Sequence, residues 1–138
     1  IAPGLLRFID YKTGSDSNKA GNSIANLFQG DHSRNAIFQL LVYAEAYHDL
    51  VDPSVNILPA LHIIKDIVRE GVIAPITYNK APMQPFPALS DEFRPMLNQL
   101  FTRIFDPDEP FCQTTDSNNC RYCPFLSICG RTLPPDFN

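Results

Sequence analysis

The sequence predicts a mixed α/β domain that ends in a cysteine-rich loop. Runs of large apolar and β-branched residues at 5–11, 56–64 and 71–78 are typical of strands. Between the first two runs, residues 33–50 place apolar side chains at spacings of three and four, as a helix does. All four cysteines lie close to the C-terminus.

The composition is typical of one globular domain with a single core. The chain has 138 residues, of which 44% are hydrophobic and 11% aromatic, which favours a folded chain over a disordered one. Its formal net charge is −4, from 11 Lys and Arg against 15 Asp and Glu, whereas a free-standing nucleic-acid binder usually carries a basic face. A DNA-cutting role fits this charge if other domains hold the DNA. No apolar run approaches the roughly 20 residues of a membrane-spanning helix, so we expect no membrane partner.

The first half of the chain predicts a strand, a polar loop and a helix. Residues 5–11 alternate between faces and end before a Thr-Gly pair. Residues 15–30 are rich in Ser, Asn and Gly and are typical of a flexible loop. The helix over 33–50 is apolar nearly all round, so we expect it to be largely buried, and the Asp-Pro pair at 52–53 ends it.

The second half predicts two neighbouring strands and another helix. The strands are the runs at 56–64 and 71–78, and a proline in each favours sheet edges or strand starts. Residues 80–87 contain three prolines and form an extended connector. Ser90 is a suitable N-cap for the helix that follows, and Pro95 requires that this helix starts later or bends.

The first strand continues into Asp10-Tyr11-Lys12, which places two charged groups together. Side chains alternate along a strand, so we expect Asp10 and Lys12 on one face of a central strand. A carboxylate there can ligate Mg²⁺ through oxygen. A lysine two residues on can orient a water beside a phosphate and offset charge in the transition state. The other interpretation of these residues is a solvated ion pair at a strand end.

Gln39 and Tyr43 form a second polar pair, on the predicted helix. Their spacing of four places them on one helix face. An amide and a hydroxyl presented together could hydrogen-bond a phosphate or an active-site carboxylate. Alternatively, Gln39 is a surface residue and Tyr43 is a core residue with its hydroxyl at the rim.

The order of these motifs resembles the PD-(D/E)XK nuclease superfamily, in its RecB-like branch. The shared pattern is Asp-x-Lys-Thr-Gly on a strand, a polar loop, and Gln-x-x-x-Tyr on a helix. The resemblance implies a restriction-endonuclease-like mixed sheet flanked by helices. It also implies that Asp10 binds the metal, that Lys12 is the catalytic lysine, and that Gln39 and Tyr43 are the helix motif. The substrate would be DNA and the metal Mg²⁺ or Mn²⁺.

The chain departs from this family upstream of Asp10. The family has another acidic ligand on a strand before the Asp-Tyr-Lys strand, often with a further His or Glu, whereas none of the nine residues before Asp10 is acidic. We therefore interpret residues 1–138 as the C-terminal part of a RecB-like nuclease domain, with the upstream remainder of the polypeptide completing the metal site. The intact protein would be a Mg²⁺-dependent deoxyribonuclease of the exonuclease type. Residues 1–138 alone are expected to cleave poorly or not at all.

The cysteines have the spacing Cys112-x7-Cys120-x2-Cys123-x5-Cys129, within residues 106–138. This spacing in a loop favours a site for Zn²⁺ or an iron–sulfur cluster, in a reducing cytoplasm. The last three cysteines resemble the C-terminal end of AddB-type helicase–nucleases and of related nucleases in CRISPR adaptation. The resemblance implies that Cys120, Cys123 and Cys129 hold a [4Fe-4S] cluster with one upstream cysteine, as a staple for the domain. Cys112 would then be a bystander, or a substitute ligand that favours Zn²⁺ in the fragment.

We therefore predict a metal-dependent DNA nuclease domain of a helicase–nuclease that acts in double-strand-break repair and recombination, with a helicase subunit or domain as partner. Two alternatives stay open. A non-catalytic nuclease-like module would bind DNA or a partner without cutting, although retention of both Asp10 and Lys12 argues against it. If the chain is instead a zinc-binding interaction domain, the proximity of Asp10 and Lys12 is accidental and has no catalytic role. The upstream sequence, read for an Asp and a Cys, separates the three.

Overall fold

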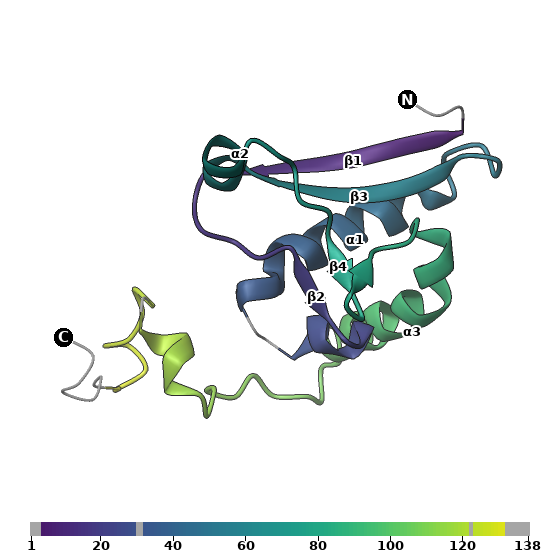
Figure 1. The fold of residues 1–138 in the computed structure, drawn as a ribbon. Helices are drawn as coiled ribbons and strands as arrows, with labels where there is room; N and C mark the ends of the chain where they lie inside the picture. The colour runs from purple at the N-terminus through teal and green to yellow at the C-terminus, as the bar shows by residue number, and fades with distance from the viewer. Residues whose placement is uncertain (1–3, 30–31, 122, 132–138) are drawn as a thin grey trace. The chain divides into compact units, whose positions relative to one another are not determined.

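The computed structural model describes residues 4–29, 32–121 and 123–131. The chain divides into two compact units, Ile1–Thr102 and Arg103–Asn138. The larger unit contains the strands and nearly all of the helical residues, and Figure 1 shows the order of its elements. This order confirms the mixed α/β class, with helices flanking the sheets. None of the helices in the described ranges is long and apolar enough to cross a lipid bilayer.

Two parallel strands form the main sheet of the larger unit. β1 spans Leu5–Lys12 and β3 spans Asn56–Ile63, paired in register from Leu5 with Asn56 to Lys12 with Ile63. Both agree with strands that the sequence predicts. Within the described residues β1 pairs with β3 alone, so the expected central position of the Asp-Tyr-Lys strand is wrong for this structure.

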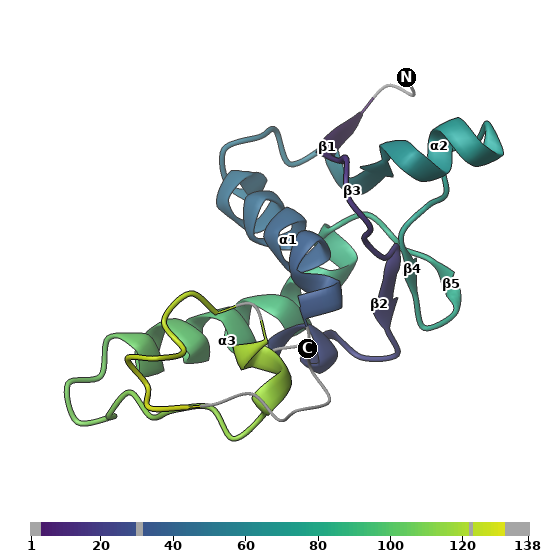
Figure 2. The same cartoon turned by 90° about the vertical axis from the view of Figure 1, so that its left-hand side faces the viewer.

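The helix α1 connects these two strands and packs on one face of the pair (Figure 1, Figure 2). It spans Asn35–His48, close to the predicted bounds, and ends at His48, before the Asp-Pro pair. Its buried residues are Ala36, Ile37, Leu40, Leu41 and Ala44. The helix is not covered all round, because a sheet of two strands covers only one stripe of it. Tyr43 and Tyr47 lie outside that stripe and are exposed.

Residues 15–30, predicted to be a flexible loop, contain regular structure. The strand β2 covers Lys19–Gly21, and a 3-10 helix, η1, covers Ile24–Phe28. Ser23 and Asn26 cap η1 reciprocally, each side chain accepting a backbone N–H. Three apolar residues of the segment are buried: Ala20, Ile24 and Leu27. So few apolar residues show no period, which is why the sequence pattern indicates a loop here.

The segment after β3 differs most from the prediction. A short helix, α2, spans Ile64–Glu70, and Gly71 ends it in the left-handed conformation, with a φ of 70°. The predicted strand over 71–78 is wrong: only β4, Thr77–Tyr78, is extended. β4 pairs with β2 and with β5, Ala81–Pro82, rather than with β3. Pro75 interrupts the run, because it lacks the N–H that a strand ladder needs.

The helix α3 spans Pro87–Ile104, so it begins before the predicted cap at Ser90. Pro87 suits a first helical position, where no N–H is needed, and Pro95 lies inside the helix. Phe93 of α3 is fully buried. Its ring contacts three other rings, those of Phe28, Phe38 and Phe86. This aromatic cluster joins α3 to η1 and α1.

The described residues of the smaller unit are mostly irregular, as predicted for a cysteine-rich loop. A 3-10 helix, η3, covers Ser117–Cys120, and hydrogen-bonded turns follow it. Near its start, Arg103 pairs with both carboxylate oxygens of Glu109.

Candidate active site

The C-terminal end of β1 brings Asp10 and Lys12 together. Both side chains leave the strand on the face that α1 covers, and Lys12 Nζ lies 3.0 Å from Asp10 Oδ2. They converge as the strand alternation predicts. Tyr11, between them, points to the opposite face, where its ring meets His62 edge-on at 5.2 Å between centroids. The side chains of Asp10 and Lys12 are 22% and 31% exposed, so a ligand can still reach the pair.

Asp10 has one buried carboxylate oxygen without a directional partner. The distance from Oδ2 to the Lys12 ammonium would allow a hydrogen bond, but no described group meets this oxygen with hydrogen-bond geometry. We therefore treat the contact as an ion pair. An ion pair without hydrogen-bond geometry offsets the burial of this oxygen only in part, and a hard divalent cation is a partner that carboxylate oxygens take in such places.

Asp10 provides one ligand of such a metal site and not a full set. Mg²⁺ is usually held by one or two carboxylates together with water and substrate phosphates. Within the described ranges, no three or more His, Cys, Asp or Glu side chains gather. The Asp10 carboxylate is therefore a suitable ligand for Mg²⁺ or Mn²⁺. The remaining ligands have to come from water, the substrate or another segment.

Lys12 connects β1 to α1 through Gln39. Lys12 Nζ donates to Gln39 Oε1 at 3.5 Å, and Gln39 Nε2 donates to the Tyr43 hydroxyl at 2.5 Å. The spacing of four on α1 is what brings the last two together. Asp10, Lys12, Gln39 and Tyr43 thus form one continuous polar chain from the strand to the helix.

The Lys12 ammonium is protonated at neutral pH. Its contact with the Asp10 carboxylate is the largest influence and raises the pKa of Lys12 above the ordinary 10.5, against an opposing effect of desolvation. The charge of Asp16 raises the pKa further. A lysine in this state offsets negative charge or orients water, but it cannot accept a proton.

Two neighbours of this site are not predicted from the sequence. Lys65, in the first turn of α2, donates to Ser15 Oγ at 2.8 Å, just beyond β1; α2 itself is not predicted by the pattern. The ring of Tyr47 meets that of Phe8 edge-on at 5.3 Å between centroids. The spacing of four between Tyr43 and Tyr47 is the signal that places Tyr47 on the same helix face.

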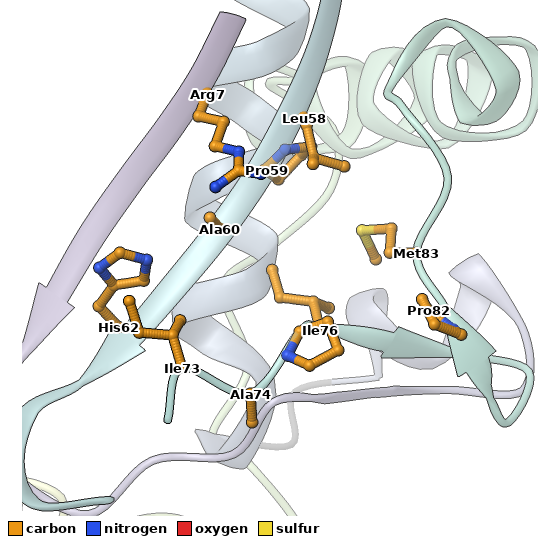
Figure 3. Close-up of a pocket in the computed structure, with 11 residues that line it drawn as sticks. Arg7, Leu58, Pro59, Ala60, His62, Ile73, Ala74, Ile76, Pro82 and Met83 are labelled. Carbon is orange, nitrogen blue, oxygen red and sulfur yellow. The ribbon is translucent and has the colours of Figure 1, made fainter. Parts of the chain in front are cut away.

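A cavity of 260 Å³ lies on the other face of β3 (Figure 3). Arg7, Ala60 and His62 line it from the strands, and Ile76 and Met83 line it from the segments beside β4 and β5. The strand residues of this lining alternate with the Asp-Lys pair, so the cavity opens on the opposite face. It has no acidic lining residue, so it offers no ligand to a divalent metal.

The described cysteines of the smaller unit are not brought together as a set of three or more ligands. Cys112 and Cys129 are exposed free thiols, and Cys120 and Cys123 are partly buried free thiols. Arg131 donates to Cys120 Sγ at 3.4 Å, to Gln113 Oε1 at 3.2 Å and to the Thr114 carbonyl oxygen. This arginine therefore connects the two ends of the cysteine segment by hydrogen bonds. The metal site at these cysteines stays a prediction.

A comparison with protein families gives one result. The sequence model of the PD-(D/E)XK nuclease superfamily matches residues 2–130, a range that contains both polar pairs and all four cysteines. No curated protein and no solved structure matches the chain. The observed α/β arrangement is consistent with the restriction-endonuclease-like fold. The chain therefore belongs to the PD-(D/E)XK nuclease superfamily.

Proposed function

We propose that this chain is the nuclease part of an enzyme that hydrolyses phosphodiester bonds of DNA with Mg²⁺ or Mn²⁺. The observation that supports this most is the pairing of Asp10 with Lys12 on the face that α1 covers. Membership of a nuclease superfamily supports the class of activity. In this proposal Asp10 ligates the metal and Lys12 contacts the scissile phosphate. Gln39 and Tyr43 position Lys12.

Lys12 acts as a fixed positive charge beside the scissile phosphate. As an ammonium it offsets negative charge on the phosphoryl oxygens. When bound, the metal ion supplies Lewis-acid polarisation of the phosphate and lowers the pKa of a bound water. The Asp10 oxygen that lacks a directional donor is the oxygen suited to ligation.

Gln39 and Tyr43 act as positioning residues for Lys12. An ammonium has three donors. Asp10 and Gln39 lie close to it, at 3.0 and 3.5 Å, which leaves donor capacity for a phosphate oxygen. The contact with Gln39 is long for a hydrogen bond, so the ammonium can move toward a substrate at little cost. Tyr43 holds the Gln39 amide in the orientation that presents its oxygen to Lys12.

We further propose that the chain is of the RecB-like, AddB-type branch. The order of the Asp-Tyr-Lys-Thr-Gly strand, the Gln-x-x-x-Tyr helix and the cysteine triplet supports this. On this proposal the domain works in the cytoplasm beside a helicase subunit or domain, as an exonuclease in double-strand-break repair. Another segment of the polypeptide provides the second acidic ligand. Cys120, Cys123 and Cys129 hold a [4Fe-4S] cluster with a fourth cysteine, and Zn²⁺ with Cys112 is the alternative for residues 1–138.

A second candidate function is a nuclease-like module that binds DNA without cutting it. The observation that favours it is the single carboxylate at the site, because the described residues gather no larger ligand set there. The two candidates differ in whether a divalent metal makes the intact protein cut DNA.

Metal-dependent cleavage by the intact protein separates them. End-labelled DNA is incubated with Mg²⁺ or with a chelator, and the products are resolved on a denaturing gel. We expect cleavage that requires the metal and that Asp10→Asn abolishes, while the matched change Asp91→Asn, at an exposed aspartate of α3, preserves it. Metal-independent DNA binding without any cleavage would favour the second candidate and overturn the first.

A further inference from the structure

An open groove lined by aromatic rings lies between β1 and α1, beside the candidate site. Its volume is 380 Å³, and its lining residues are Arg7, Phe8, Ile9, Leu40, Tyr43 and Tyr47. Resting on the proposed function, we infer that this groove is a base-stacking subsite. It takes an unpaired nucleobase of the DNA strand whose phosphate lies at Lys12, so the substrate that the site cuts is single-stranded at that point.

The two tyrosine rings of the groove are held in place and still open to solvent. Tyr43 and Tyr47 are 45% and 52% exposed. Tyr43 is held by its hydroxyl, which accepts the Gln39 amide at 2.5 Å. Tyr47 is held by its edge contact with Phe8, at an interplanar angle of 70°. Aromatic rings that are fixed at one edge and otherwise exposed are the surfaces on which unpaired bases stack.

The backbone positions of the two tyrosines are spaced along α1 by a distance similar to two steps between stacked bases. Tyr43 and Tyr47 are four residues apart on α1, which corresponds to a rise of about 6 Å along the helix axis. Bases of one strand follow each other at about 3.4 Å, so two steps span about 6.8 Å. The two positions are therefore far enough apart along the helix for one base to lie beside both side chains.

The chemistry of the groove favours a base over a phosphate. None of its lining residues is acidic, and all except Arg7 are apolar or aromatic. The guanidinium of Arg7 reaches toward the cavity on the other face of β3 (Figure 3), so it does not bring its charge into the groove. A flat, largely apolar ligand such as a nucleobase is what such a lining accepts.

The groove is continuous with the proposed reaction centre through Tyr43. The hydroxyl of this residue ends the polar chain that starts at Lys12, and its ring lines the groove. A strand whose phosphate meets Lys12 therefore has a neighbouring base beside the rings. A paired base cannot enter, because in a duplex both of its faces are stacked and its edge is bonded to the partner strand, and extruding it costs free energy.

Binding to strands with and without bases tests this inference. The intact protein is titrated, with chelator present to prevent cutting, against fluorescent oligothymidylate and against an abasic strand of the same length. Tyr47→Leu should weaken binding of oligothymidylate about 5- to 150-fold, the range expected for one lost base stack. Tyr47→Phe keeps the ring and should bind within about twofold of the wild type. The abasic strand should bind equally to the wild type and to Tyr47→Leu.

Three results would overturn the subsite: equal affinity of the wild type for both strands, unchanged oligothymidylate binding by Tyr47→Leu, or an equal loss for both strands in that variant. The first comparison needs no variant, so it holds even if Tyr47→Leu folds poorly. Cleavage assays on the same preparations keep the two proposals apart. Metal-dependent cutting without base preference refutes the subsite alone, and base-dependent binding without cutting refutes the nuclease proposal.

Discussion

Replacing Phe93 with Leu should weaken the aromatic cluster that joins α3 and η1 to α1. The Phe93 ring is fully buried, with centroid distances of 5.5 Å to Phe28, 6.0 Å to Phe38 and 6.0 Å to Phe86. Phe38 directly precedes Gln39 on α1, so the cluster supports the helix that carries half of the candidate site. The variant therefore tests how the fold holds that helix.

The magnitude follows from the three ring pairs. An aromatic pair contributes roughly 0.5–1.5 kcal/mol beyond its buried area. Leu recovers part of the lost packing, so the cost stays below the roughly 3–5 kcal/mol of a Phe→Ala change. We expect the free energy of unfolding to fall by about 1.5–3 kcal/mol. In a unit of this size each kcal/mol corresponds to about 4–8 °C, so Tm should fall by about 6–24 °C.

Thermal unfolding followed by far-UV circular dichroism measures this effect. The matched control is Phe101→Leu, the same change on the same helix at a side chain that is 45% exposed. It should alter the free energy of unfolding by no more than about 0.5 kcal/mol. Equal shifts of Tm in the two variants would refute the reasoning, because the burial of the Phe93 ring would then contribute nothing.

Three further predictions concern an ion pair, an ionisation and the cysteines. Glu45→Gln removes the carboxylate that pairs with Arg94 at 2.5 Å between α1 and α3. It should lower Tm more than Glu70→Gln, the same change at the exposed glutamate that ends α2. Burial, followed by the charge of a nearby glutamate, raises the pKa of Tyr78 above its ordinary 10.0. The unfolded chain therefore loses this proton first as pH rises through about 10, so stability falls there, and Tyr78→Phe should reduce that fall in a series of thermal melts. In the anaerobically purified intact protein, Cys123→Ala should lower Tm, iron and sulfide together while Cys112→Ala changes them little; stoichiometric zinc without iron would contradict the cluster.

The part of the fold that could be predicted is the part with a strong period. β1, α1 and β3 follow from alternation and from the spacing of apolar residues, and both polar pairs lie on these elements. Because side chains two apart on a strand, or four apart on a helix, share a face, the contacts of Asp10 with Lys12 and of Gln39 with Tyr43 were predictable too.

The remainder depends on contacts between distant segments. β2 and β4 are strands of three and two residues that exist because they pair with each other, and no local sequence pattern predicts such pairing. α2 is only seven residues long and has no buried residue, so its apolar residues cover too short a stretch to establish a helical period. Likewise, the unpartnered oxygen of Asp10 and the contact of Tyr47 with Phe8 arise only when α1 packs on β1.

The rate of Mg²⁺-dependent DNA hydrolysis by the intact protein with Lys12→Ala tests the nuclease proposal most directly. The lysine is proposed to offset charge on the scissile phosphate, so its loss should reduce the rate by roughly 10²–10³-fold, with the circular dichroism spectrum unchanged. Lys65→Ala is the matched control, since Lys65 is a neighbouring lysine that donates to Ser15 Oγ, and it should retain most of the rate. Two results would contradict the nuclease proposal: a Lys12→Ala protein that cuts DNA as fast as the wild type, or a decrease in rate that is no larger in Lys12→Ala than in Lys65→Ala.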